Sequence, residues 1–173
     1  MDAEGIKAGE ALAILCETYW FPIYAFIRRS GIKPQDAQDL TQGFFCRLVK
    51  TNFLAAADPA KGKLRSFLLA CVSNYLADER DRAGAQKRGA AVLVTLNPDL
   101  AERRYKTEAF DNLAPDRLFQ RQWALSMLEH TMELLGQEFE ESNKKEIFLA
   151  LRPFLGFAPQ PEKGYEEISR ELV

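Results

Sequence analysis

Two short acids and an amide recur at helical spacing in one stretch of this 173-residue chain. Asp36, Asp39 and Gln42 follow one another at intervals of three residues, so a helix would make them neighbours. Carboxylates pair with arginine and lysine, and an amide can bridge polar groups. Short acids are poor helix formers, so a reason other than helix propensity is indicated for their presence. The plainer alternative is an ordinary solvated helix face.

Basic residues gather in the next part of the chain. They are Lys61, Lys63, Arg65, Arg80, Arg82, Lys87 and Arg88. The net charge of the whole chain is only −2, but a local basic cluster matters more for nucleic-acid binding than the total. A basic cluster near a helix end can also complement the helix dipole without any ligand.

Residues that could support catalysis are sparse. His130 is the only histidine, and Met127 stands three residues before it, where a di-iron bundle needs glutamate. The chain has no GxxxxGK[ST] loop, no GxGxxG fingerprint and no second histidine to activate a nucleophile. Cys16, Cys46 and Cys71 lack CxxC spacing and fall on or beside apolar helix faces, which predicts buried reduced thiols. We therefore expect no enzyme activity, no cofactor and no metal site.

Composition and length favour one or two small globular domains. Hydrophobic residues make up 47% of the chain and charged residues 28%. The first residues do not follow the basic-then-apolar pattern of a signal peptide, and no apolar run is long enough to span a bilayer. We therefore expect a cytoplasmic protein without a membrane partner.

Apolar periodicity predicts an all-α fold. Helices are expected over residues 9–30, 34–52, 63–85, from 115 to about 135, and 143–154. Pro22 predicts a kink or a break in the first helix, whereas Pro34 and Pro115 suit the first turn of a helix. We expect a three-helix domain over residues 1–89, an extended linker over 90–114 with a strand-like piece at 92–96, and a smaller helical part over 115–173.

Three residues on these helices have two interpretations each. Phe45 follows the apolar Phe44 and could face either the core or a partner. Phe67 is aromatic and close to the basic cluster, but its place on the apolar stripe of the third helix favours the core. Gly43 is costly inside a helix, so it either permits the close approach of a partner or is merely tolerated.

Several linked motifs resemble bacterial RNA polymerase sigma factors. Residues 36–45, Asp-Ala-Gln-Asp-Leu-Thr-Gln-Gly-Phe-Phe, are similar to region 2.2 of that family. Residues 15–31 resemble the helix that precedes this region, and residues 58–68 resemble the loop and helix that follow it. The best match is the extracytoplasmic-function type, which is built from regions 2 and 4. The resemblance covers residues 12–89 well and the remainder more loosely.

The resemblance implies roles for particular residues. It implies a surface that docks on the clamp helices of the largest subunit of the polymerase core, formed by Asp36, Asp39, Leu40, Gln42 and Phe45. It implies that the following loop and helix capture a flipped base of the non-template strand of the promoter −10 element. The residues expected to contact this DNA are Lys61, Lys63, Arg65, Ser66, Asn74, Arg80, Lys87 and Arg88. An anti-sigma protein is a further candidate partner.

The end of the chain resembles the beginning of region 4. Residues 121–135 and 164–173 are similar to it, and the latter contain the family's Tyr-x-Glu-Ile-x-x-x-Leu run. The recognition helix that should follow is not in the sequence, so we expect a truncated chain that does not read a −35 element. A natural protein that kept only the core-binding part is the alternative.

Two other functions stay open from the sequence. One is a sigma-like interaction module that binds polymerase or a regulator without opening promoters. The other is an unrelated helical enzyme or ligand-binding bundle, which has only the general helical pattern in its favour.

Overall fold

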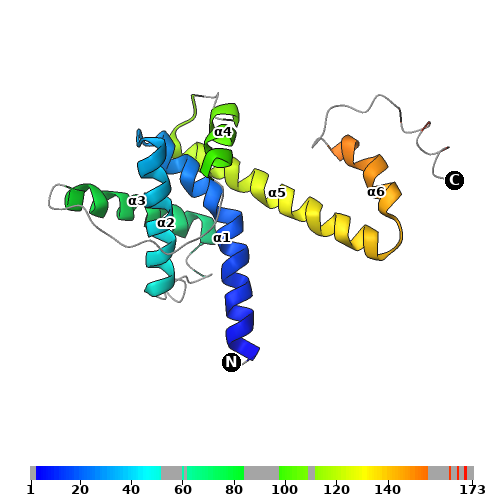
Figure 1. The fold of residues 1–173 in the computed structure, drawn as a ribbon, viewed down its shortest axis with the longest axis horizontal. Coiled ribbons are helices and arrows are strands. Elements are labelled where there is room, and N and C mark those ends of the chain that lie inside the picture. Colours follow the sequence, from blue (N-terminus) through cyan, green and yellow to red (C-terminus); the bar gives the residue numbers. More distant parts are fainter. Residues whose placement is uncertain are drawn as a thin grey trace. The chain divides into compact units, whose positions relative to one another are not determined.

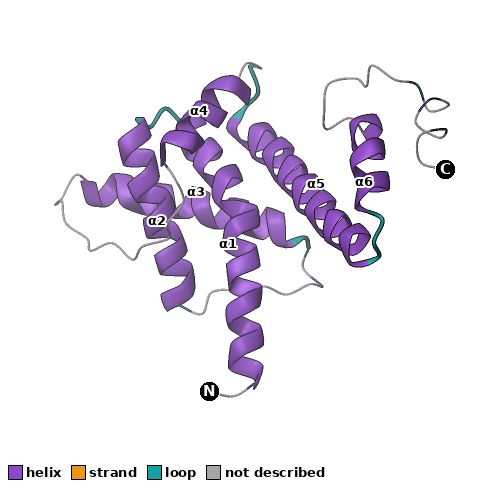
Figure 2. Cartoon of the chain, turned by 45° about the vertical axis from the view of Figure 1, so that its right-hand side comes forward, coloured by secondary structure: helices purple, strands orange, loops and turns teal. Residues whose placement is uncertain are grey.

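The structure is a computed structural model, and it describes residues 3–51, 60, 62–83, 98–108 and 112–155, together with residues 164, 167 and 170. Every regular element within these ranges is helical (Figures 1 and 2), which confirms the all-α class. The chain forms two compact units, Met1–Met127 and Leu128–Val173. The first unit thus extends well beyond residue 89, where the sequence predicted its end.

The first helix, α1 (Ala3–Arg29), starts earlier than predicted and continues through Pro22. The predicted alternative of a helix break at this proline is therefore wrong. Proline removes one backbone hydrogen bond from a helix, but the turns around it carry large buried side chains. Ile23, Tyr24 and Ile27 are completely buried, and burial of each such side chain stabilises the fold by about 1.5–3 kcal/mol.

The second helix, α2 (Pro34–Lys50), begins at the predicted proline and has Asp36 in its first turn. Its inward side follows the helical repeat, with Ala37, Thr41, Phe44, Phe45 and Leu48 buried. The hydroxyl of Thr41 donates a hydrogen bond of 2.6 Å to the carbonyl oxygen of Ala37, so this buried polar group is satisfied.

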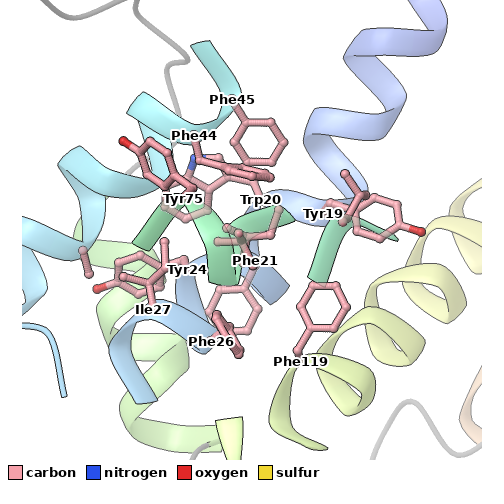
Figure 3. Packing of buried hydrophobic residues seen from close by; sticks show 14 of the residues in the cluster. Tyr19, Trp20, Phe21, Tyr24, Phe26, Ile27, Phe44, Phe45, Tyr75 and Phe119 are labelled. Carbon is pink, nitrogen blue, oxygen red and sulfur yellow. The ribbon is translucent and has the colours of Figure 1, made fainter. Parts of the chain in front are cut away.

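The third helix, α3 (Leu64–Ala83), completes an aromatic core with α1 and α2. Figure 3 shows Phe44, Phe45 and Tyr75 gathered beside Trp20. The ring of Phe44 lies 5.6 Å from that of Phe45 and 5.7 Å from that of Tyr75, measured between centroids. Such tilted contacts are the favoured geometry for aromatic pairs. The stripe predicted for this helix is largely confirmed, since Leu68, Val72, Tyr75 and Leu76 are buried.

Residues 98–108 form a helix, α4 (Pro98–Glu108), where the sequence predicted part of an extended linker. The prediction is wrong for this segment, and the strand-like piece expected at 92–96 lies outside the described residues. The helix has few apolar residues, so apolar periodicity does not reveal it. Contacts with α1 hold it instead: Glu102 pairs with Arg28 and accepts a hydrogen bond of 2.6 Å from the hydroxyl of Tyr24.

The fifth helix, α5 (Pro115–Glu141), starts at the predicted proline, and its first turns belong to the first unit. Leu118, Phe119 and Gln122 are buried there. The ring centroids of Phe119 and Tyr19 lie 6.4 Å apart, so α5 extends the core of α1. Figure 3 shows the two side chains near each other.

The second unit contains the rest of α5, the short helix α6 (Lys145–Leu151) and the 3-10 helix η3 (Arg152–Leu155). The ring of Phe148 lies so close to Gly136 that a Cβ on residue 136 would come within 3.0 Å of it. The α-helix predicted over 143–154 is shorter than expected, because α6 ends at Leu151 and Pro153, which has no N–H to continue the α hydrogen bonds, lies in the 3-10 turn that follows. Among the described helices, none is both long and apolar enough to cross a bilayer.

Candidate functional site on the outer faces of α2 and α3

The outward side of α2 carries Asp36, Asp39 and Gln42, three of the five residues predicted to contact the polymerase core. A fourth, Leu40, packs against the hydrophobic core at the edge of that side. Asp36 and Asp39 are exposed, while Leu40 and Gln42 are half-buried. None of these four side chains forms an ion pair or a hydrogen bond within the described residues. We call this group the α2 acidic surface. Its carboxylates keep their full capacity to accept hydrogen bonds from another molecule.

Phe45, the fifth predicted residue, is not part of this surface. Its side chain is only 1% exposed, because residue 45 continues the inward series of Thr41 and Leu48. The prediction that Phe45 contacts a partner is therefore wrong, and its alternative place in the core is correct.

Gly43 permits a close approach within the molecule. A Cβ on residue 43 would overlap the phenol oxygen of Tyr75 in α3. Tyr75 is 7% exposed, and burial raises its pKa to about 12, so the phenol is neutral at physiological pH. The glycine thus lets α3 pack tightly on α2, so the group that approaches residue 43 is Tyr75 of the same molecule, which neither interpretation of the sequence anticipated.

An ion pair on the rim of the core also joins α2 to α3. Nη1 of Arg47 lies 2.7 Å from Oδ2 of Asp78, and the Arg47 guanidinium lies over the ring of Tyr75 at 5.8 Å. Because both charged side chains are about half exposed, at 46% and 45%, the pair contributes at most about 1 kcal/mol. Together with the Gly43–Tyr75 contact it fixes how the outer faces of the two helices are oriented.

The outward side of α3 carries three of the residues predicted to contact DNA. Ser66, Asn74 and Arg80 are exposed, and helical geometry places them along one side over about 21 Å. Lys63 is exposed just before the helix, whose first turn contains no acidic residue. A cation at a helix N-terminus opposes the dipole, typically by 0.3–1 kcal/mol at low ionic strength. Stability of the helix therefore does not explain why Lys63 stands there.

The other residues predicted to contact DNA lie either outside the described residues or on the inward side of α3. Lys61, Lys87 and Arg88 lie outside the described residues. Arg65 is described, but it occupies the inward side of α3, three residues before the buried Leu68. Its guanidinium carbon lies 4.4 Å from the ring centroid of Trp123 in α5. The structure thus separates Arg65 from the outer face formed by Ser66, Asn74 and Arg80.

Trp123 is the one residue near this site that the sequence did not connect with it. The sequence placed Trp123 beside the apolar stripe of its helix, and nothing in the chain's local pattern links it to Arg65. The spacing of Arg65 from Leu68 and Val72 does indicate an inward position on α3. That spacing was the available signal that Arg65 differs from its basic neighbours.

Groups suited to catalysis or metal binding are not assembled in the described part of the chain. No three His, Cys, Asp or Glu side chains lie there in a metal-binding group. Cys16, Cys46 and Cys71 are half-buried, where the sequence predicted buried thiols. Burial raises the pKa of the Cys16 and Cys71 thiols, which lowers the thiolate fraction at neutral pH.

Comparison with known proteins gives no relative on which to base a function. No protein-family model, no curated protein and no solved structure matches the chain.

Proposed function

We propose that the chain is a promoter-recognition subunit of the sigma type, which docks on bacterial RNA polymerase core and binds the non-template strand of the −10 element. The observation that carries this proposal is the α2 acidic surface. Asp36 and Asp39 face outward and have no ion-pair or hydrogen-bond partner among the described residues, on a helix whose motif resembles region 2.2. A sigma subunit would act in the cytoplasm and by binding alone.

The chemistry of the α2 acidic surface suits a basic helical partner. Each carboxylate can accept charge-assisted hydrogen bonds, which contribute about 1.5–3 kcal/mol when well formed. Leu40 adds a partly exposed apolar contact between them, and Gln42 can both donate and accept hydrogen bonds. The clamp helices of the polymerase, which the resemblance implies as the partner, would supply the arginine side chains.

The outer face of α3 suits a single nucleic-acid strand. Lys63 and Arg80 offer cations to phosphates, which position a strand without reading its sequence. Asn74 lies between them along the chain and offers an amide, a group that can pair with a base edge. Because flipping a base costs a few kcal/mol, favourable contacts with the strand are needed to hold the opened state.

A second candidate is a sigma-like module that binds polymerase but does not open promoters. The net charge of −2 for the whole chain favours it, because strand binding depends on an excess of cations near the phosphates. The two candidates agree on core binding and differ only in DNA binding.

Two measurements on the full chain test both candidates. Size-exclusion chromatography with core polymerase at low salt should show co-elution, and its absence would reject both. Fluorescence anisotropy with a labelled non-template −10 oligonucleotide should then show binding when core is present. Binding to core without binding to this strand would favour the interaction module over the sigma subunit.

A further inference from the structure

Arg65 differs from Arg28 and Arg47, two other arginines of the first unit that lie over aromatic rings. Arg28 lies over Tyr105 at 4.9 Å and pairs with Glu102, while Arg47 lies over Tyr75 and pairs with Asp78. Arg65 is stacked as closely on Trp123, but it pairs with no carboxylate among the described residues. Its Nε is buried there without a hydrogen-bond partner.

A stacked guanidinium without a carboxylate is an incomplete arrangement. Stacking occupies one flat side of Arg65, and because Nε is buried, the two terminal amino groups are the donors that remain for an oxyanion. If the contact served only to hold α5 on α3, an acid would be expected beside it, since Arg28 shows that this protein pairs its half-buried arginines. Phe119 already anchors α5 in the core, so Arg65 is not needed for that purpose.

We propose that Trp123 is a positioning residue that holds Arg65 for a phosphate of the bound strand. This inference rests on the proposed function, and it adds α5 to the elements that build the DNA site. A flexible arginine loses side-chain entropy when it binds a phosphate. Because stacking on the indole already restricts the Arg65 side chain before the strand binds, less entropy is lost on binding. The ligand class is a phosphodiester of single-stranded DNA, which the fork of an arginine recognises with two parallel hydrogen bonds.

The test uses the full chain bound to core polymerase and a labelled non-template −10 oligonucleotide, titrated at several salt concentrations. Arg65→Gln and Trp123→Leu should each weaken binding, by roughly 2- to 30-fold for a cation–π contact. Both should lower the salt slope by about 0.7, the loss of one phosphate contact on a single strand. Trp123→Phe, which keeps an aromatic face, should restore most of the affinity.

A double variant separates positioning from a merely structural role. If Trp123 acts through Arg65, adding Trp123→Leu to Arg65→Gln should produce no further loss. Additive losses, unchanged binding by Trp123→Leu, or tighter binding because the indole blocks Arg65 would each overturn the inference. If circular dichroism shows that Trp123→Leu does not fold, Trp123→Phe and Arg65→Lys are compared with the natural chain instead. Lysine keeps the charge without the fork, so Arg65→Lys should still bind more weakly than the natural chain, and equal binding would overturn the inference.

These outcomes are distinct from a failure of the proposed function. If the natural chain with core does not bind the oligonucleotide at all, the sigma assignment is rejected. If the natural chain binds and Arg65→Gln binds equally well with the same salt slope, only the role of Arg65 and Trp123 is rejected.

Discussion

Gly43 of α2 and the phenol oxygen of Tyr75 of α3 occupy adjoining space, with no room between them for a side chain on residue 43. The ring of Tyr75 is held in turn by Phe44 and by the guanidinium of Arg47. The phenol therefore cannot move away without disturbing the core. This contact sets the distance between the two helices that carry the candidate site.

Gly43→Ala should lower the free energy of unfolding by about 1–3 kcal/mol, because the new methyl group overpacks against Tyr75. In a Tyr75→Phe background the same change should instead stabilise the protein by up to about 1 kcal/mol. Without the hydroxyl, the nearest ring carbon of residue 75 would lie 3.6 Å from the new Cβ, which is an ordinary contact distance. The higher helix propensity of alanine would then be the remaining effect on stability. Urea denaturation followed by circular dichroism measures both values. Stabilisation by Gly43→Ala in the natural background would contradict the close contact.

Glu102→Gln should destabilise the first unit by about 1.5–3 kcal/mol, because it removes charge-assisted hydrogen bonds from α4 and leaves Arg28 without its anion. The bonds run from Nε and Nη2 of Arg28 to the carboxylate at 2.9 and 3.0 Å. Glu17→Gln is the matched control, since Glu17 is an exposed acid of α1 that forms no ion pair with any residue that the structure describes. Equal stability of both variants in urea denaturation would show that α4 does not depend on this pair.

The stability that Glu102 provides should depend on pH in a defined direction. Hydrogen bonding from Arg28 lowers the pKa of the Glu102 carboxyl below its ordinary value of about 4.3. The unfolded chain therefore binds a proton at a higher pH than the folded chain, and this contribution is complete above the unfolded pKa. It should be lost as pH falls through the folded pKa. The difference in stability between the natural chain and Glu102→Gln should shrink over that acidic range, and a difference that grows would contradict the pairing.

Substitutions on the outer face of α3 should differ in how they change the affinity for the oligonucleotide and the salt dependence of that affinity. Lys63→Gln and Arg80→Gln should each weaken oligonucleotide binding in the presence of core and reduce the salt slope by about 0.7. Asn74→Ala should weaken binding without changing the slope, because an amide neutralises no phosphate. Lys144→Gln, an exposed lysine of the second unit, is the control for general charge. Equal slopes for all four variants would argue against strand binding on this face.

Much of the fold was predictable from the sequence because local rules specify it. Pro34 and Pro115 mark helix starts, and the apolar repeat of α3 places Leu68 and Val72 in the core. The helix α4 was not predictable in the same way. It depends on the pairing of Glu102 with Arg28, which lies 74 residues away in the sequence, and no local pattern reports such a contact.

The candidate site was predictable in composition but not in arrangement. The spacing of Asp36 and Asp39 was sufficient to place both on the outside of α2. Phe44 and Phe45 are both buried, and residue type alone did not decide whether Phe45 faces the core or a partner, so only its burial resolved the question. The partner of Arg65 comes from a distant helix, and periodicity alone indicated only that Arg65 turns inward.

The affinity of α2 variants for core polymerase tests the central claim most directly. Asp39→Arg combined with Gln42→Ala should weaken binding by roughly tenfold or more, the loss of at least one charge-assisted contact, while the helical circular dichroism spectrum stays unchanged. The control is Glu138→Arg with Gln137→Ala, which makes the same charge change at exposed positions of the second unit. The proposal predicts weakened binding for the α2 variant alone. Equal affinity of both variants for core would contradict it.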